Sequence, residues 1–396
     1  MSLDFQDVRK QVIDMGESAA LRTARIKELR EQARAIFDQY SDEVDALRGK
    51  VEQVARLHDP LIRTAMPFRE PLNSSFPLPP LPHNVTFMAA DGSQIAPDRH
   101  AQVDYCLTNV AVISMQAGTS LPPSTLRRCN LLTGDMLHTE HGLITDARLN
   151  LMRDFAERSE LAKAALEAFP PVVSFTDGAL ELWMSPSNDH ADQSEFKKQQ
   201  KEYLRLLKSL CQRSVITAGY VDKPGSSLLV RLLEIAMTPE NLLPDIRRLR
   251  PLRGILDVDI LFGSLEPGQR SAVFALKSRS TEIYQEELAL HFFFLNVGRP
   301  EHPYWARVEI PAWVAEDESL LDVLHAALVQ QCSVLGSRPY PYLLHRAHED
   351  AVVTLREKEE VSQMIALELR KRGVEVGEAS NKQFTKDSGS RMRYSR

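Results

Sequence analysis

Cysteine is scarce in this chain. The 396 residues include four cysteines, which lie far apart in the sequence: Cys106, Cys129, Cys211 and Cys332. No CxxC pair and no Cys/His spacing typical of a zinc site occurs. The sequence therefore excludes a disulfide scaffold, predicts no structural zinc and indicates a reducing compartment.

Long apolar runs are also missing. No segment approaches the ~20 apolar residues that a membrane-spanning helix needs. The first residues, MSLDFQDVRK, lack the apolar core of a secretory signal peptide. We therefore expect a cytoplasmic protein.

The chain has no overall excess of positive charge. Its formal net charge is -6, so it lacks the broadly basic surface of proteins that hold nucleic acid through many phosphate contacts. Contact with DNA would need a local basic patch. The best candidate is Arg247, Arg248, Arg250 and Arg253, followed by Lys197, Lys198 and Lys201. Charge runs are more often solvated faces, and that alternative stays open here.

Several nucleotide and hydrolase motifs are absent. No GxxxxGK[ST] occurs, so the sequence predicts no ATP binding through a P-loop. No GxSxG and no strand-linked GxGxxG supports a hydrolase elbow or a dinucleotide site. If the function needs an ATP-driven motor, that motor must be another protein.

What is present is the composition of an ordinary folded protein, with 43% hydrophobic and 26% charged residues. The length exceeds the roughly 100 to 200 residues of one typical domain, so we expect one large elaborated domain with appendages, or two domains. We predict four ranges: an N-terminal helical segment (1–59), a Pro-rich linker or arm (60–84), the main domain (85–373) and a polar basic tail (374–396).

The two N-terminal ranges have distinct patterns. Apolar residues in the first range repeat at gaps of three and four, which predicts a long amphipathic helix or a helical hairpin: Ile26, Leu29, Ala33, Ile36, Tyr40, Val44, Leu47, Val51 and Val54. This helical segment could pack on its own domain or dock on a partner. Seven of the 23 prolines then lie between positions 60 and 82, which favours extended backbone.

The main domain alternates strands and helices. The runs VTFMAADGSQ, DYCLTNVAVISM and TLRRCNLLTGDMLHT predict an antiparallel meander. Residues 146–167 have helical period, and Pro170-Pro171 ends them before the apolar strand PVVSFTDGAL. Further strands and helices follow. The pattern predicts an α/β fold with a mixed central sheet flanked by helices.

Two of these strands end in similar tripeptides, Asp91-Gly92-Ser93 and Asp177-Gly178-Ala179. An Asp-Gly pair by itself most often marks a tight turn. Here each pair follows a continuous apolar strand of the kind that lies inside a sheet, and carboxylates placed there need a compensating cation. A bound divalent metal would supply it, and the glycines would let a substrate or water approach closely.

A third acid is expected, because a two-metal site is held by several carboxylates. The helix at 146–167 offers two candidates. Glu157 lies roughly opposite the apolar stripe, and Glu160 lies nearer its border. We favour Glu160 and keep Glu157 in reserve; the alternative is that both simply face solvent.

Two residues near the C-terminus complete the candidate set. His348 shares a helix face with Leu344, Ala351 and Leu355, so we expect it to point inward. Such a histidine is usually a core residue, but beside carboxylates it can ligate metal or donate a proton. Tyr340 can orient a phosphate or water through its hydroxyl, or simply anchor the start of a helix.

The order of these motifs resembles the NurA nuclease family. The resemblance covers about residues 85–354 and rests on ADGSQIAPDRH, a strand with TNV, SELAKAAL, VVSFTDGAL, TAGYVDKPGSSLLVRLL and YPYLLHRAHEDAV. It implies an RNase H-like core, manganese-dependent cutting of DNA, a ring-like homodimer and a hexameric HerA-type ATPase partner in DNA end resection. By position it implies that Asp91, Glu160, Asp177, Tyr340 and His348 form the site; DGA stands where the family more usually has a second DGS.

We therefore expect a metal-dependent deoxyribonuclease in which Asp91, Glu160 and Asp177, with His348, hold two Mn²⁺ or Mg²⁺ ions and hydrolysis leaves 5′-phosphate ends. Tyr340 would position the scissile phosphate. One alternative is a non-catalytic RNase H-like subunit that docks on a helicase or DNA. Another is a phosphoesterase for small molecules, which predicts a closed pocket.

Overall fold

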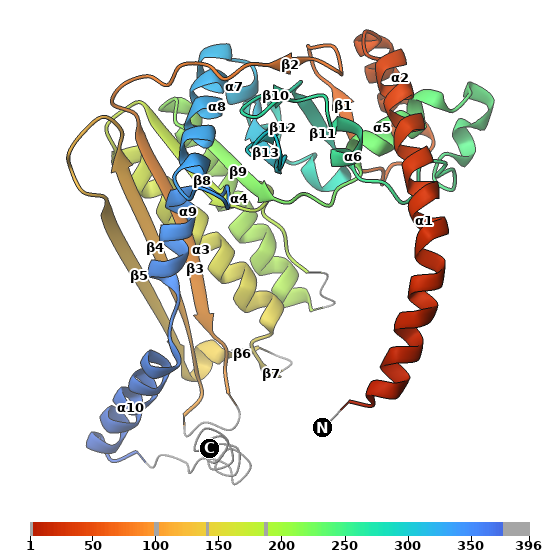
Figure 1. Ribbon diagram of the computed structural model, residues 1–396. Helices are drawn as coiled ribbons and strands as arrows, with labels where there is room; N and C mark the ends of the chain where they lie inside the picture. Colours follow the sequence, from red (N-terminus) through yellow and green to blue (C-terminus); the bar gives the residue numbers. More distant parts are fainter. Residues whose placement is uncertain (1–2, 99–102, 140–141, 186–188, 375–396) are drawn as a thin grey trace. The chain divides into compact units, whose positions relative to one another are not determined.

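The computed structural model describes residues 3–98, 103–139, 142–185 and 189–374 (Figure 1). Contacts divide the chain into two compact units. The first unit comprises Met1–Pro80 and Tyr220–Ser333, and the second comprises Leu81–Gly219 and Val334–Arg396. The four ranges expected from the sequence follow the chain, whereas these units follow contacts in space. The predicted basic tail lies outside the described residues, except for its first residue.

The second unit is built on the predicted meander. Strands β3 (Thr86–Ile95), β4 (Tyr105–Gln116) and β5 (Ser124–Thr133) pair antiparallel, and β8 (Val172–Asp177) runs parallel to β3 on its other side. The first residues of β9 (Ile216–Asp222) continue the order β5-β4-β3-β8-β9. A meander, a helix and a strand parallel to the first is the order of RNase H-like folds. The predicted α/β class with an RNase H-like core is confirmed.

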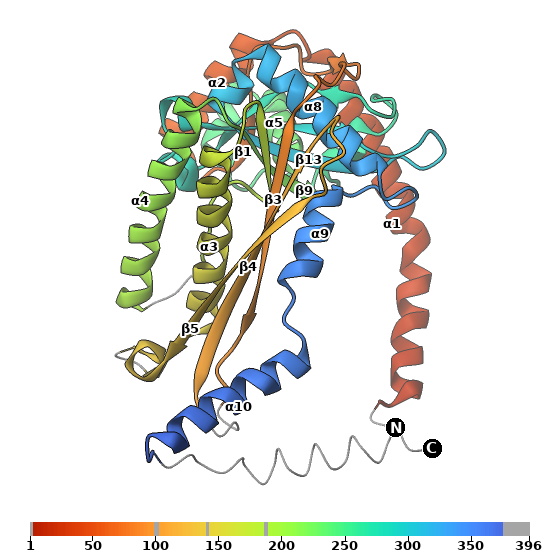
Figure 2. The same cartoon turned by 90° about the vertical axis from the view of Figure 1, so that its left-hand side faces the viewer.

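Helices cover both faces of this sheet (Figure 2). Helices α3 (Asp146–Glu167) and α4 (His190–Gln212) lie on one face, and α9 (Tyr342–Ala351) packs on β3 and β4 from the other. Thr145 caps α3 by accepting a hydrogen bond from the Arg148 amide. Because α3 lies between the sheet and α4, it buries residues on more than one side. Helix α10 (Leu355–Lys371) follows α9 after a short break.

Small elements complete the second unit. After β5 come the 3-10 helix η1 (Gly134–Leu137) and the two-stranded sheet of β6 (His138–Thr139) and β7 (Gly142–Leu143). Helix α10 begins with a reciprocal cap between Thr354 and Glu357. Its apolar side packs on Tyr105, Leu107 and Ile95 at the far end of β3 and β4.

The first unit contains the N-terminal helices α1 (Phe5–Gln39) and α2 (Val44–Leu57), with Leu47, Val51 and Val54 of the predicted repeat buried in α2. The Pro-rich range forms two short strands, β1 (Thr64–Pro67) and β2 (Ser75–Phe76). Strand β1 pairs with β11 (Phe274–Lys277), which continues to β12 (Leu290–Asn296) and β13 (Trp305–Pro311). The remaining elements are α5 (Leu228–Met237), η2 (Glu240–Asp245), α6 (Asp257–Leu261), β10 (Arg270–Ser271), η3 (Arg279–Thr281), η4 (Glu286–Leu288), α7 (Ala312–Ala315) and α8 (Glu318–Ser333).

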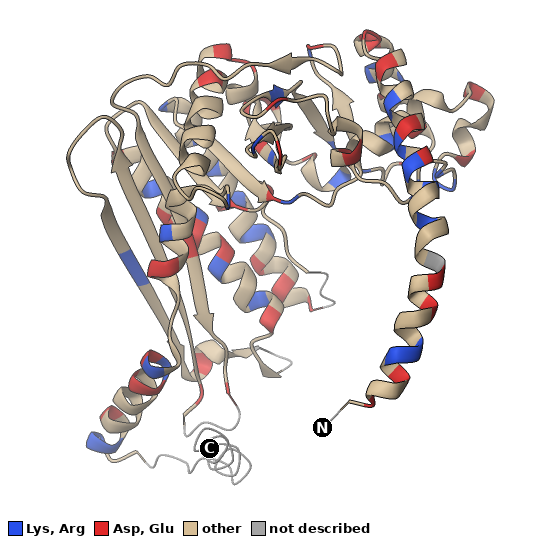
Figure 3. Cartoon of the chain, in the orientation of Figure 1, with Lys and Arg blue, Asp and Glu red and all other residues tan. Residues whose placement is uncertain are grey.

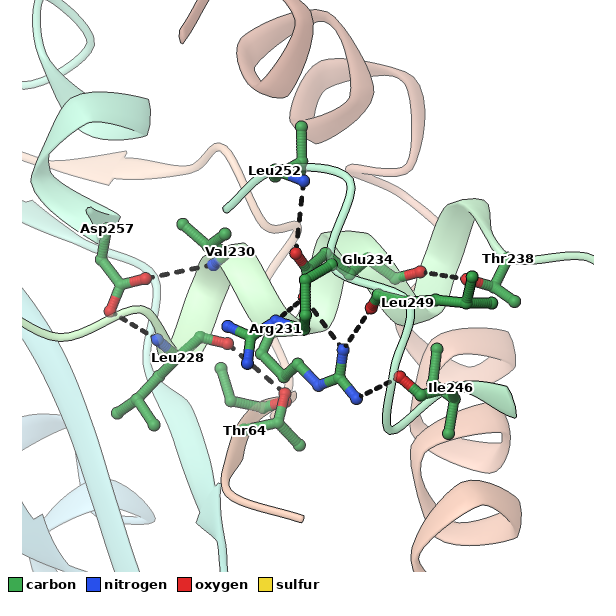
Figure 4. Close-up of polar contacts among 12 residues, drawn as sticks. Thr64, Leu228, Val230, Arg231, Glu234, Thr238, Ile246, Leu249, Leu252 and Asp257 are labelled. Atoms are coloured by element: carbon green, nitrogen blue, oxygen red, sulfur yellow. Dashed lines mark hydrogen bonds and ion pairs between the residues drawn. The ribbon is translucent and has the colours of Figure 1, made fainter. Parts of the chain in front are cut away.

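A buried polar network surrounds α5 in the first unit (Figure 4). The fully buried carboxylate of Glu234 accepts from Arg231 at 2.9 Å, from Arg250 at 2.8 Å and from the Leu252 amide at 3.3 Å. Asp257, also buried, accepts from the amides of residues 228 and 230 at the start of α5. Each buried carboxylate is therefore bound to donors, as the cost of burying charge requires.

Charged residues of both signs occur along the long helices (Figure 3). The longest helix is α1, with 35 residues, and basic and acidic residues recur along its whole length. Across the described ranges, no helix combines the length and the apolar content that crossing a membrane takes.

The Glu234 network yields a stability prediction. Glu234→Ala should lower the free energy of unfolding by about 3–5 kcal/mol, because it leaves the buried Arg231 guanidinium uncompensated. The matched control is Glu202→Ala, which removes an exposed ion pair with Arg205 and should cost less than about 1 kcal/mol. Urea unfolding of both variants provides the measurement, and equal losses would contradict the prediction.

Candidate active site

Two neighbouring strands bring Asp91 and Asp177 to the same place in the second unit. Asp91 lies within β3, and Asp177 is the last residue of β8. In the parallel register Ala90 is opposite Thr176, so the two aspartates are the next residues on adjacent strands. Gly178 follows with φ +82, a left-handed conformation that suits glycine and ends the strand.

These aspartates line a cavity of about 290 Å³ that lies entirely within the second unit. Its walls come from β3, α3 and the segment after β8: Asp91, Arg153, Asp154, Glu157, Arg158, Asp177, Gly178, Ala179, Glu181 and Trp183. Five carboxyl groups and two guanidinium groups thus meet in one small volume. The cavity has an excess of acidic groups.

Glycine at position 92 makes room for the third acid. A Cβ placed on Gly92 would lie 2.6 Å from Oε1 of Glu157 and 3.0 Å from Cγ of Arg153. The absent side chain therefore lets α3 lay Glu157 against β3. We expected this glycine to admit a substrate or water; in the structure a side chain of the protein takes that space.

Burial and neighbouring charge change the protonation of Glu157. Burial first, and then the nearby carboxylates of Asp154 and Asp91, together raise the pKa of this carboxyl from 4.5 to about 8, against the opposing charges of Arg158 and Arg153. The Nε of Arg153 lies 3.1 Å from Oε1 of Glu157, and Nη2 of the same guanidinium group donates to Oδ1 of Asp154 at 2.8 Å. One guanidinium group therefore bridges two carboxyl groups of the cavity.

Glu160, the favoured helical acid, lies elsewhere. Its carboxylate pairs with Lys163 at 2.7 Å and Arg128 at 3.8 Å, and the residue does not belong to the cavity lining. The expectation that Glu157 lies opposite the packed face of its helix is wrong: its side chain is 12% exposed. The cause is the position of α3 between two layers, which leaves it more than one packed face.

His348 contacts Asp91 from the other face of the sheet. Its Nδ1 lies 2.7 Å from Oδ2 of Asp91, while 66% of the imidazole side chain is exposed. The expectation that this side chain is enclosed in the core is therefore wrong, although Leu344 and Ala351 of the same helix face are buried. The Ala351 carbonyl accepts hydrogen bonds from Asn109 at 2.8 Å and from the Ser93 hydroxyl, which fixes the end of α9 on the sheet.

The other predicted residues lie outside this cavity. Tyr340 is half-buried in the segment that leads into α9 and is not part of the lining. The four arginines of the basic patch are exposed on the first unit, and Arg250 pairs there with Glu234. Their contact with DNA stays a prediction.

The sequence reasoning did not single out several lining residues: Arg153, Asp154, Arg158, Glu181 and Trp183. A signal existed for the helical ones. Charged residues at 153, 154, 157 and 158 recur one turn apart, so they lie together on one side of α3. After β8, Glu181 lies between two buried leucines. Burying a carboxylate there costs free energy of folding, so an acid at this position is a signal of a functional residue.

The cavity suits a divalent cation by charge and by ligand type. Carboxylate oxygens are the ligands that Mg²⁺ and Mn²⁺ prefer. Five carboxyl groups face only two guanidinium groups in the lining, so the negative charges are not fully compensated when all of the carboxyl groups are ionised. In the part of the chain that the structure describes, no three His, Cys, Asp or Glu side chains converge as metal ligands do. By ligand chemistry, Asp91, Glu157 and Asp177 are the residues of the lining that we expect to fit such an ion.

The raised pKa predicts how stability depends on pH in the presence of a chelator. Folded Glu157 keeps its proton up to about pH 8, whereas the unfolded residue loses it near 4.5. The folded state therefore binds more protons between these values, and its stability should fall as pH rises through that window. The Glu157→Gln variant has no titrating carboxyl at this position, so it should lack this part of the pH dependence. Melting temperatures of both proteins from pH 5 to 9 should diverge; parallel profiles would contradict the assignment.

Comparisons with known proteins identify the family of this chain. Residues 85–353 match the model of the NurA domain. No curated protein sequence matches the chain. Many solved structures are similar to it at low identity, and three of them are described below. The NurA nuclease from Sulfolobus solfataricus has 14% identity, with 86% of this chain and 98% of that chain covered and a TM-score of 0.48.

A NurA structure with manganese has 10% identity, coverage of 87% and 97%, and a TM-score of 0.37. The catalytic domain of human Endonuclease V has 14% identity, coverage of 82% and 98%, and a TM-score of 0.32. All three scores lie below 0.5, so the assignment depends on the family model. Because that model spans more than half of the chain, including β3, α3, β8 and α9, this protein belongs to the NurA family of nucleases.

Proposed function

We propose that this nuclease hydrolyses phosphodiester bonds of DNA at the cavity of the second unit, with divalent metal as its cofactor. The observation that carries the proposal is the meeting of Asp91, Asp177 and Glu157 in one cavity on an RNase H-like sheet. The surplus of carboxyl groups favours cations, and a phosphodiester could approach such a cavity only once its charge is compensated. Cleavage would leave 5′-phosphate ends.

Asp91, Glu157 and Asp177 would hold two Mn²⁺ or Mg²⁺ ions, with His348 beside them. When bound, the ions would supply activation of the attacking water and stabilisation of the leaving oxygen. We assign the helical carboxyl to Glu157 in place of Glu160, because Glu157 lines the cavity while Glu160 is engaged by Lys163. Glu157 would lose its proton when a cation binds, since positive charge lowers a carboxyl pKa.

The remaining residues would orient the scissile phosphate and supply a proton to the leaving oxygen. Asp91 holds Nδ1 of His348, so Nε2 of the exposed ring is free to exchange a proton with the leaving oxygen. Arg153 neutralises Asp154 and lies against Glu157 before substrate binds, and it can turn to a phosphate oxygen afterwards. For Tyr340 the family position alone supports a role in placing the phosphate.

The biological setting that we propose is the processing of DNA ends at double-strand breaks in the cytoplasm, with a hexameric HerA-type ATPase as partner and a homodimer as the working form. The sequence has no P-loop, so DNA translocation by ATP would depend on the partner. The exposed arginines at 247, 248 and 253 are candidates for contact with the DNA backbone.

Substitution of the cavity acids tests the catalytic proposal. Asp91→Asn, Asp177→Asn and Glu157→Gln should each lower hydrolysis of a DNA oligonucleotide in Mn²⁺ by a factor of about 100 or more, because each removes a metal ligand. Glu160→Gln is the matched control and should retain activity, since its carboxylate lies outside the cavity. Initial rates on labelled DNA provide the measurement, with circular dichroism to confirm folding.

The outcomes separate the alternatives. Loss of activity in Glu160→Gln but not in Glu157→Gln would reverse the assignment of the helical acid. Wild-type protein that hydrolyses no DNA in Mn²⁺ would favour a non-catalytic subunit. Hydrolysis of bis(p-nitrophenyl) phosphate without any cleavage of DNA would favour a phosphoesterase for small molecules.

A further inference from the structure

A large aromatic side chain lies at the edge of the acidic cavity. Trp183 belongs to the cavity lining, together with Asp91 and Asp177, and is 60% exposed. Single exposed apolar residues are common on proteins, so exposure alone assigns no role. Its place in the lining does suggest one, because a ligand bound in the cavity lies within reach of the exposed indole.

The segment that carries Trp183 is held by the scaffold. Three residues before it, the buried Leu180 accepts a hydrogen bond from the Tyr203 hydroxyl of α4 at 3.0 Å. The carbonyl of Ala179 accepts from the Arg158 guanidinium of α3 at 2.9 Å. Two helices thus fix the backbone between Asp177 and the indole. An aromatic ring on a fixed backbone loses little conformational entropy when it binds a ligand.

The charge of the cavity restricts what this rim can attract. Five carboxyl groups lie in the lining, and both guanidinium groups are engaged, Arg153 by Glu157 and Arg158 by backbone carbonyls. A DNA phosphate gains little from such a rim without added cations. A nucleobase is uncharged, and its flat face can stack on an indole whatever the base.

We propose that Trp183 stacks on an unpaired nucleobase next to the bond that is cleaved, which makes a single strand or a frayed end the substrate of this site. Bases inside a duplex are already stacked on their neighbours and do not offer a free face. The inference rests on the proposed nuclease function, since it concerns the same cavity. Trp183 is then a substrate-binding residue that selects unpaired DNA.

The test combines a substitution with a change in the substrate. Trp183→Ala should lower kcat/KM on a single-stranded oligonucleotide by about tenfold, and Trp183→Phe should recover most of the loss, because a phenyl ring still stacks. An oligonucleotide with abasic positions around the cleaved bond should lose about the same factor with wild-type protein. With Trp183→Ala, the abasic and normal strands should be cleaved equally, as removing either partner abolishes one shared contact.

Phe169 provides a matched control. It is an aromatic residue of the second unit, 74% exposed, and it lies outside the cavity lining. Phe169→Ala should leave kcat/KM and the abasic effect unchanged. If Trp183→Ala weakened cleavage of normal and abasic strands by the same factor, the indole would act only structurally and the inference would be overturned.

Binding without turnover gives a second readout. In the Asp177→Asn variant with Mg²⁺, a single-stranded oligonucleotide should quench tryptophan fluorescence, and adding Trp183→Phe should remove that quenching although Trp305 and Trp313 remain. Binding seen by anisotropy with no quenching assigned to Trp183 would overturn the inference while leaving the nuclease function intact. A wild-type protein that cleaves no DNA would instead refute the proposed function itself.

Discussion

Crowding of negative charge in one small volume is the constraint on which the rest of this site depends. Asp91 and Asp177 lie side by side on neighbouring strands, and α3 adds Asp154 and Glu157 to the same cavity. The protein meets this repulsion in two ways, with the guanidinium of Arg153 and with a proton retained on Glu157. Both compensations are reversible, so added cations can replace them. A cavity of this kind attracts cations before it attracts a phosphodiester.

The first unit also buries a carboxylate, but there the charge is paired within the fold. Glu234 is as deeply buried as a side chain can be, yet two arginines and a backbone amide satisfy its carboxylate. A network with every partner in place specifies structure and leaves no affinity for an added ion. The two carboxyl clusters therefore differ: the charge of Glu234 is fully paired within the fold, whereas the cavity acids outnumber their basic partners.

Close approach of backbone elements keeps the acidic cavity in shape. Gly92 admits Glu157 against β3, and at Gly219 of β9 a Cβ would lie 2.6 Å from the Leu180 amide, so the segment after β8 can lie tightly on the sheet. On the opposite face, the Ala351 carbonyl is bound by Asn109 of β4. The contacts come from strands and helices far apart in the chain, and they position the segments that carry the acids, His348 and Trp183.

The sequence by itself determined the local elements: the apolar strands, the Asp-Gly ends at 91 and 177, the helix between them and the motif order that indicated the family. These follow from short-range periodicity, which needs no partner. Tertiary structure decided which acid of α3 enters the cavity, that His348 reaches Asp91 from an exposed position, and that Arg153 and Trp183 line the site. A helix enclosed by a sheet and a second helix has several packed faces, and a single apolar stripe cannot show which face meets the strands.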